Sequence, residues 1–379
     1  MLINRVFILV LATVLLGCCK DEETYHIPLD YSFVDKEGRS TVSFSGQKAR
    51  MDQLSEISAY MKSAHTPGVA LSSEQLLDMY SNSNGTGSVY FTESAAVVDK
   101  QLKNKTGRGD ALLISKYETL FNDLATASQS TTEDNYITTS GSAGVLQSGL
   151  STYLVDENGA EYAQIIEKGL MGAVFYDQIQ NVYLSDEKMN VDNTMAVDAA
   201  NGKYYTLMEH HWDEAFGYFT DATDFPNSGT DRFWGKYAQL VSLELESGRT
   251  LFNAFIKGRA AISNKDYKTR DQMIKLISAE LEKVTAASAI HYLNQAENLF
   301  TDNAKRCHTL SEAVAFIEVL RYSNPAYTQF TTLQLDELVS HFKNQSSQYD
   351  FWNVTIDDIL QLRDRVSEIM GFDAIKEQL

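Results

Sequence analysis

Long stretches of this chain lack an obligatory helix breaker, because its 379 residues include only four prolines. They are Pro28, Pro67, Pro226 and Pro325. Proline interrupts a helix because it lacks a backbone donor and clashes with the preceding turn. From Ala49 onward, apolar residues recur at spacings of three and four, the period of amphipathic helices. Strand patterns are scarce, so the sequence predicts an all-α protein.

The same periodicity predicts helices along most of the chain. The predicted ranges are 49–64, 72–80, 92–104, 109–128, 159–184, 203–218, 230–263, 267–301, 304–322, 331–346 and 355–370. Two polar stretches separate groups of these helices. Residues 130–150 are rich in Ser, Thr and Gly and predict a long loop, and residues 186–202 predict a second polar connection.

Two of the predicted helices are apolar on all sides instead of along one stripe. These are residues 163–184 and 309–322, and such helices are expected to be buried. Within the first, Gly169 and Gly172 would let a neighbouring helix approach closely. One central helix in each half of the chain predicts two helical bundles packed together, and an old duplication is a further hypothesis.

This organisation gives four predicted segments. Residues 1–17 form a signal peptide, 18–48 an extended polar tether, 49–200 the first bundle and 201–379 the second bundle. The boundary between the bundles is expected within the polar connection that precedes residue 201.

The first residues have the character of a secretory signal peptide. Arg5 precedes an apolar run from Val6 to Leu16, which is too short to cross a bilayer as an anchor. The run ends in "LLGC", which resembles the lipobox of bacterial lipoproteins, whose peptidase cuts before a cysteine that then receives diacylglycerol. This predicts lipid attachment at Cys18. The alternative is an ordinary signal peptide in which Cys18 is incidental.

The residues after the lipobox indicate a location. "CKDEE", residues 19–23, resembles the lysine-plus-acidic signal that exports lipoproteins of some Gram-negative bacteria to the cell surface. We therefore expect a lipid-anchored protein of the outer membrane, exposed on the cell surface. Apart from Cys18, only Cys19 and Cys307 occur, which provides no disulfide framework. Stability must then come from a packed core.

The formal net charge of −19 excludes one class of partner. A phosphate backbone would be repelled by such a surface, so nucleic acid is not an expected ligand. Most of this charge is expected to serve solubility.

The stretch "EHHWDEAFGYF", Glu209 to Phe219, concentrates ionisable side chains next to aromatic ones. At 100° per residue, His211 falls within a broad apolar arc and Glu214 falls at its edge. Glu209, His210 and Asp213 fall on the opposite side and are expected to face solvent. Burying the Glu214 carboxylate is costly unless a cation, a metal or hydrogen-bond donors meet it. His211 and Glu214 are therefore candidate metal ligands, although His211 could equally be a core histidine.

The second central helix offers a matching pair. His308 and Glu312 are four residues apart, so they lie on one face. If the two pairs converge, two imidazoles and two carboxylates would form a plausible shell for iron, zinc or manganese inside a bundle. In the alternative reading, "HTLSE" is a helix start in which Thr309 or Ser311 caps and Glu312 supports the first turn.

The remaining histidines carry little signal. His291 shares a face with polar residues and is expected to be exposed, and His26, His65 and His341 show no ligand spacing. The chain contains no HExxH and no G-x-S-x-G motif.

Several of these features together resemble a known family. The lipobox, the "HHWDEAFGYF" and "RFWGKY" runs and the later "HTLSEAVAFIEVLRY" are similar to an uncharacterised branch of the imelysin-like lipoproteins, over most of residues 45–379. That resemblance implies paired helical bundles and an association with iron or haem uptake at the bacterial envelope. The imelysin signature G-x-H-x-x-E places its histidine and glutamate at His211 and Glu214, while Glu209 stands where the signature has glycine.

Three functions follow as expectations. The first is an envelope lipoprotein that binds a metal ion, iron or zinc, or a metal-containing ligand during iron or haem acquisition. The second is a metallopeptidase of the imelysin type that acts on surface polypeptides. The third is a non-catalytic adaptor or glycan-binding partner of an outer-membrane transporter.

Overall fold

The computed structural model describes residues 25–92, 94–131, 140–227 and 231–379. Within these residues the regular secondary structure is almost entirely helical, which confirms the predicted all-α class. The predicted signal peptide, the lipid-attachment residue Cys18 and the export signal at residues 19–23 lie outside the described residues.

The helices and the single hairpin have the following bounds. The α-helices are α1 Ser45–Ser63, α2 Ser73–Ser81, α3 Ala111–Ser128, α4 Tyr162–Leu170, α5 Asp186–Met189, α6 Leu207–Phe219, α7 Phe233–Leu240, α8 Ser242–Leu245, α9 Ser247–Ser263, α10 Tyr267–Asn298, α11 Asn303–Val319, α12 Thr332–Ser340 and α13 Ile356–Met370. Strands β1 Gly144–Ser148 and β2 Ser151–Val155 pair antiparallel.

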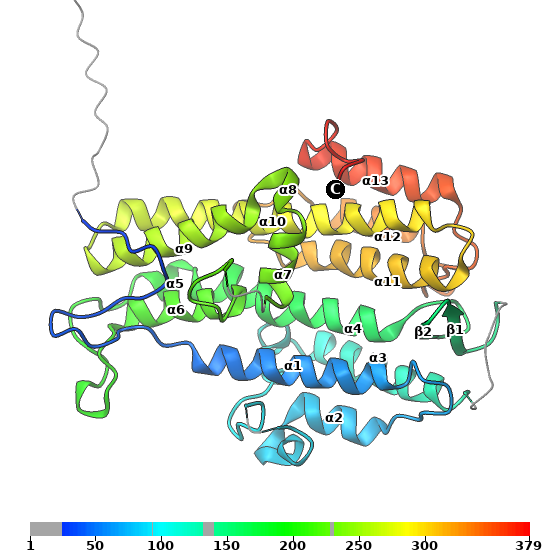
Figure 1. Ribbon diagram of the computed structural model, residues 1–379, viewed down its shortest axis with the longest axis horizontal. Coiled ribbons are helices and arrows are strands. Elements are labelled where there is room, and N and C mark those ends of the chain that lie inside the picture. Colours follow the sequence, from blue (N-terminus) through cyan, green and yellow to red (C-terminus); the bar gives the residue numbers. More distant parts are fainter. Residues whose placement is uncertain (1–24, 93, 132–139, 228–230) are drawn as a thin grey trace, which may run out of the picture.

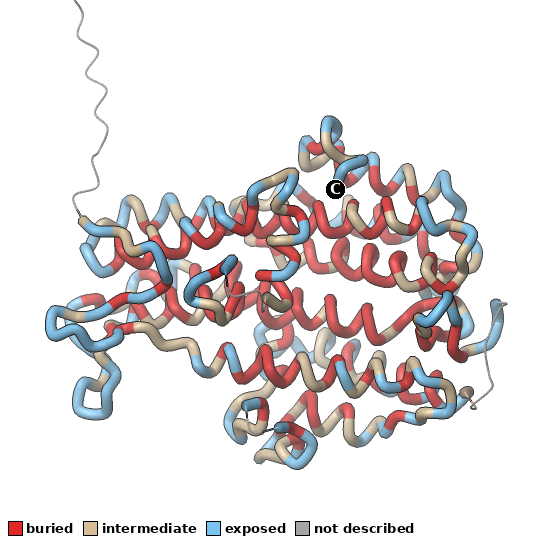
Figure 2. The backbone as a smooth tube through the Cα atoms, in the orientation of Figure 1, coloured by how far each residue is buried: buried red, intermediate tan, exposed pale blue. Residues whose placement is uncertain are grey.

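The long helices lie side by side in layers (Figure 1). The longest, α10, packs against α9, α11 and α13, and α11 in turn packs against α4. Helix α4 also packs against α1 and α3. Figure 2 shows that buried backbone runs along α4, α10 and α11, so these helices form the centre of the molecule.

The predicted central helix over 163–184 is confirmed as buried. Helix α4 continues into two π-helical segments, Met171–Tyr176 and Gln178–Tyr183, and nearly all of these residues are inaccessible. A Cβ atom added to Gly172 would lie 2.5 Å from Val319 Cγ2 of α11. One added to Gly169 would lie 2.6 Å from the Tyr117 hydroxyl of α3. Both glycines therefore permit the close helix approach that was predicted.

The helix predicted over 92–104 is wrong in the described residues. Only a 3₁₀ segment, Lys103–Gly109, overlaps that range. Two buried amides explain the difference, because Gln53 donates to the carbonyls of Ala95 and Lys100, at 3.1 and 3.0 Å. Asn82 also donates to the Lys100 carbonyl, at 2.8 Å. Side chains thus satisfy carbonyl groups that a helix would have used internally.

Two other predicted segments need correction. The loop predicted over 130–150 contains β1, whose residues Gly144–Ser148 pair with β2; residues 132–139 lie outside the described part. The single helix predicted over 230–263 is divided into α7, α8 and α9. The last break falls at Glu246, whose backbone is left-handed with φ +53°.

The N-terminal segment from residue 25 to 44 is extended, as predicted, but it packs on the helical body instead of forming a free tether. The Tyr31 ring stacks on Phe216 of α6 with centroids 3.6 Å apart, and the Tyr31 hydroxyl donates to Asp213 Oδ1 at 2.8 Å. Tyr25 donates to Asp266 Oδ2 at 3.1 Å, immediately before α10.

The hydrophobic core is continuous on both sides of residue 200. Helix α1 packs on α6, and α4 packs on α11, so elements of the predicted bundles 49–200 and 201–379 are in direct contact. The division into two bundles at residue 201 stays a prediction. Among the described helices, none is both long and apolar enough to span a lipid bilayer.

Candidate functional site

Helix α6 carries the first candidate site, and its start is fixed by a capping box. Thr206 Oγ1 accepts from the Glu209 amide at 3.3 Å, and the Thr206 amide donates to Glu209 Oε2 at 2.9 Å. This reciprocal pair fixes the rotation of the helix, and with it the directions of the ionisable side chains that follow.

Two imidazoles of α6 converge on one carboxylate, and we call His210, His211 and Glu214 the Glu214 cluster. His211 Nδ1 lies 3.2 Å from Glu214 Oε2, and His210 Nε2 lies 4.0 Å from the same oxygen. The side chains of His210, His211 and Glu214 are 27%, 11% and 17% exposed, so the cluster is sheltered but reachable from solvent.

Neighbouring groups orient each member of the Glu214 cluster. His210 Nδ1 lies 3.1 Å from the Ser43 carbonyl, which can only accept, so Nδ1 carries hydrogen and Nε2 can offer its lone pair. The Tyr205 ring stacks on His210 with centroids 4.6 Å apart. Gln47 donates to Glu214 Oε1 at 3.0 Å, which leaves Oε2 toward the imidazoles.

The electrostatics of the Glu214 cluster suit a cation. Burial lowers the pKa of His210, which keeps its imidazole neutral near pH 7. Burial alone would raise the pKa of Glu214, but the hydrogen bond from His211 and the charge that His210 carries only at acidic pH outweigh it and lower the pKa. The carboxylate is therefore ionised beside a neutral ring.

Glu209 and Asp213 were predicted to face solvent, and this prediction is wrong. Both are buried against Arg259 of α9, whose Nε donates to Asp213 Oδ1 at 2.9 Å and whose Nη1 donates to Glu209 Oε1 at 2.8 Å. The Thr41 carbonyl accepts from Nη2 of the same guanidinium at 3.0 Å. Burial raises the pKa of Asp213 to about 6 despite the charge of Arg259. This face of α6 is covered by the N-terminal segment and by α9.

The second predicted pair, His308 and Glu312, lies in a different cluster. His308 Nδ1 is 2.6 Å from Glu161 Oε2, and His308 Nε2 is 3.6 Å from Glu312 Oε2. His65 Nε2 is 3.2 Å from the other oxygen of Glu161. Lys168 Nζ is 2.9 Å from Glu312 Oε1, so Glu312 already has a cationic partner.

The charges in this second cluster balance one another. We call it the Glu161 cluster, and its members are Glu161, Glu167, Glu312, Lys62, Lys168, His65 and His308. Burial would raise the pKa of Glu161, but the charge of His308 outweighs it and holds the pKa at about 2. Burial would lower the pKa of His308, but Glu161 raises it. Three carboxylates thus face two lysines and an imidazole whose protonation Glu161 favours, which leaves little net charge for a metal ion to neutralise.

The two predicted pairs do not form one shared site. Helix α1 passes both clusters, since Gln47 contacts Glu214 while Lys62 lies 2.5 Å from Glu167. Residues 47 and 62 are fifteen positions apart, which on a helix with a rise of about 1.5 Å per residue separates the clusters by roughly 22 Å. Figure 1 shows α6 toward one end of the molecule and the hairpin beside the start of α11 toward the other.

Several members of these clusters could not be recognised as site residues from the sequence. His65 has no ligand spacing, and Glu161 comes from a distant part of the chain. His210 was assigned to the solvent face, although its Nε2 approaches Glu214 four residues later. His26 and His341 are exposed. His291 was predicted to be exposed but is half-buried, with Nε2 2.6 Å from the Gln295 amide.

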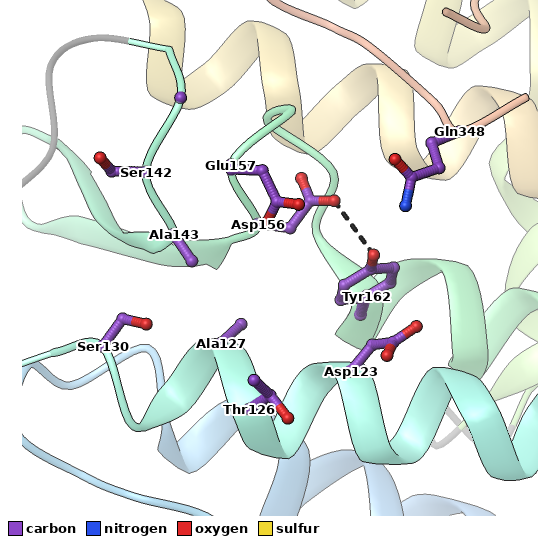
Figure 3. Close-up of a pocket in the computed structure, with 11 residues that line it drawn as sticks. Asp123, Thr126, Ala127, Ser130, Ser142, Ala143, Asp156, Glu157, Tyr162 and Gln348 are labelled. Carbon is purple, nitrogen blue, oxygen red and sulfur yellow. Dashed lines mark hydrogen bonds between the residues drawn. The ribbon is translucent and has the colours of Figure 1, made fainter. Parts of the chain in front are cut away.

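A polar cavity of about 450 Å³ lies between α3 and the end of the hairpin (Figure 3). Asp123, Asp156 and Glu157 line it together with Tyr162 and Gln348. The Tyr162 hydroxyl donates to Asp156 Oδ2 at 3.0 Å. Burial raises the pKa of Asp156 to about 6, and burial together with the charge of Glu157 raises the pKa of Asp123. Carboxylates are thus crowded in this cavity.

In the described part of the chain, no group of three or more His, Cys, Asp or Glu side chains is assembled closely enough to hold a metal ion. Within the Glu214 cluster, His211 lies 3.2 Å from Glu214, whereas His210 lies 4.0 Å from the same oxygen. The three side chains are therefore not as close together as the ligands of a bound metal ion would be.

Comparison with known proteins places the chain in a family. A family model described as Domain of unknown function (DUF4856) matches residues 28–373. The chain belongs to this family. The match starts within the packed N-terminal segment and includes both clusters, so the DUF4856 region comprises nearly the whole described body. No curated protein and no solved structure matches the chain.

Proposed function

We propose that this protein is a lipid-anchored outer-membrane protein that binds a divalent metal ion, iron or zinc, at His210, His211 and Glu214 as part of iron acquisition. The observation that supports metal binding is the convergence of two ring nitrogens on one carboxylate oxygen, at 3.2 and 4.0 Å. Two imidazoles and a carboxylate with open positions are a recurrent ligand set for divalent iron.

The distances fit this ligand set after two small changes, because His211 Nδ1 must give up the hydrogen that it donates to Glu214 and the His210 ring must rotate. Two ligands that each lie about 2 Å from one ion are roughly 3 to 3.5 Å apart. The His211–Glu214 separation of 3.2 Å falls within this range. The His210–Glu214 separation of 4.0 Å exceeds it by roughly half an ångström, which a rotation of the imidazole supplies.

The surroundings favour the same reading. The Ser43 carbonyl fixes the tautomer of His210, and a hydrogen bond to the second ring nitrogen is the usual support for a metal-bound histidine. Gln47 holds the free oxygen of Glu214 in the same way. The net charge of −19 attracts cations from solution. The membrane anchor and the role in iron acquisition rest on the lipobox before Cys18 and on the imelysin resemblance.

A titration tests the metal proposal. The protein is freed of metal with a chelator, and binding of Zn²⁺ and Fe²⁺ is measured by calorimetry for the wild type, His211→Ala and Glu214→Gln. We expect one bound ion per wild-type chain and at least about tenfold weaker binding in both variants. His291→Ala is the matched control, because His291 is a half-buried histidine that lies outside the cluster. Equal affinities for all four proteins would refute the proposal.

A further inference from the structure

A basic pocket lies beside the segment that carries Tyr183, a neighbour of the Glu214 cluster. It has a volume of about 360 Å³ and lies between the 3₁₀ segment Lys103–Gly109, the π-helical segment Gln178–Tyr183 and the start of α5. Three cationic side chains line it, from Lys105, Arg108 and Lys188.

Positive charge predominates in this pocket, although the whole protein carries −19. Arg108 Nε lies 3.2 Å from the buried Asp177, and Lys188 lies 3.6 Å from Glu187, which also lines the pocket. Three cations therefore face two carboxylates. Among the described residues, Lys105 forms no ion pair, so its charge remains available to a ligand.

The position of Lys105 agrees with this role. Its amine lies over the Tyr183 ring, 5.9 Å from the centroid. Burial, followed by the charge of Arg50, lowers the pKa of Lys105. An amine held this way gains from a bound anion, because charge-assisted hydrogen bonds strengthen where solvent is partly excluded. Arg108 keeps more than half of its side chain exposed, so it can add hydrogen bonds to carboxylate or phosphate oxygens.

Tyr183 connects this pocket to the Glu214 cluster. Its ring centroid lies 6.3 Å from that of His211. The amide of Gln47 contacts both the Tyr183 hydroxyl, at 3.4 Å, and Glu214 Oε1, at 3.0 Å. Tyr183 is therefore a common neighbour of Lys105, which lines the pocket, and of two residues that belong to or contact the Glu214 cluster.

We propose that the pocket lined by Lys105, Arg108 and Lys188 binds a small anion bearing carboxylate or phosphate groups, and that the negative charge of this anion strengthens the binding of a metal ion at the nearby Glu214 cluster. The second half of this statement rests on the proposed function. The first half stands on the pocket alone.

Calorimetry with citrate, with inorganic phosphate and with Zn²⁺ alone tests both halves separately. We expect the wild type to bind citrate, and Lys105→Met and Arg108→Gln to bind it at least about tenfold more weakly. Lys36→Met, at a lysine whose side chain is 89% exposed, should bind citrate as the wild type does. Tighter binding of phosphate than of citrate would support the anion site with phosphate as its chemistry.

The failures are distinguishable. If neither anion binds, or if Lys105→Met binds both as tightly as the wild type, the anion pocket is refuted while Zn²⁺ binding is unaffected. If His211→Ala retains wild-type Zn²⁺ affinity, the proposed function fails and the anion pocket stands. If citrate does not tighten Zn²⁺ binding in the wild type, after correction for the Zn²⁺ that free citrate chelates in solution, the link between the two sites is refuted.

Discussion

His308 Nδ1 lies 2.6 Å from Glu161 Oε2, and this ion pair between a partly buried imidazole and a fully buried carboxylate joins α11 to the start of α4. The Tyr153 ring of β2 stacks on His308 with centroids 4.4 Å apart. The pair thus connects the hairpin, α4 and α11. Its contribution to the free energy of unfolding depends on the protonation states of the two side chains.

The stability contributed by this pair should depend on pH at both ends. Glu161 has its pKa lowered to about 2, so its contribution is present above about pH 4.5 and is lost as the pH falls toward 2. His308 has its pKa raised above 6.5, so its contribution is present below pH 6.5 and is lost as the pH rises through the folded value. Replacing His308 should therefore cost most near pH 5.5.

Urea unfolding of the wild type and His308→Gln checks this. We expect a loss of about 3 kcal/mol near pH 5.5 and a smaller loss near pH 9, because the contribution of the imidazolium decreases as the pH rises. His341→Gln, at an exposed histidine, should leave stability unchanged. A loss that is identical at both pH values would show that the ion pair does not carry this stability.

Arg259→Met should strongly destabilise the protein, because it leaves Glu209 and Asp213 buried without their cation. Breaking a buried pair in this way costs about 3–5 kcal/mol. The measurement is the thermal midpoint by circular dichroism. Arg365→Met is the control, since Arg365 is an exposed partner of Glu368, where about 0–1 kcal/mol is expected. Similar midpoints for the two variants would contradict the role given to Arg259.

Asp156→Asn should stabilise the protein above pH 6 and have little effect near pH 4. Burial raises the pKa of Asp156 from 3.8 to about 6, so the folded state keeps a proton that the unfolded state has lost. Wild-type stability therefore falls as the pH rises from about 4 to 6, and the difference corresponds to ~3 kcal/mol at most. The asparagine removes this charge while keeping an oxygen for the amides of Asn158 and Ala160.

The comparison is the thermal midpoint at pH 4 and at pH 8. Asp30→Asn, at an exposed aspartate, serves as the control. A midpoint for Asp156→Asn that is lower than wild type at pH 8 would mean that the carboxylate is needed as a charge.

Gly172→Ala should destabilise the contact between the π-helical segment and α11, because its Cβ would lie 2.5 Å from Val319 Cγ2. Overpacking of this kind costs about 1–3 kcal/mol. Gly46→Ala is the matched control in α1, where the nearest atom is the mobile end of Lys100 at 3.0 Å. Urea unfolding should separate the two variants, and equal stabilities would indicate that α11 can move away freely.

Local patterns predicted much of the helical framework. The helices α10, α11 and α13 begin and end within a few residues of the predicted ranges, because each is an uninterrupted run without glycine or proline. Residues 92–104 differ because the side chains of Gln53 and Asn82 reach their carbonyls from distant positions in the chain. Such long-range hydrogen bonds leave no periodic mark.

In the candidate site, too, contacts within one helix were predictable and contacts between distant parts of the chain were not. His211 and Glu214 are three apart on one helix, so their contact followed from helical geometry alone. Glu209 and Asp213 were misplaced because their burial depends on Arg259, which lies on another helix. The partnership of His308 with Glu161 joins positions 147 residues apart and could not be predicted from spacing.

The attachment of Tyr25 to Asp266 limits how the protein can be oriented if Cys18 carries the lipid. Tyr25 is seven positions after Cys18, and a chain of that length reaches at most about 25 Å. Asp266 follows Ser263, whose hydroxyl donates to Glu209 on α6 at 2.7 Å. A bilayer holding the acyl chains would therefore remain close to the end of the body that contains His210 and His211. The end that contains the hairpin would be turned toward the surrounding medium.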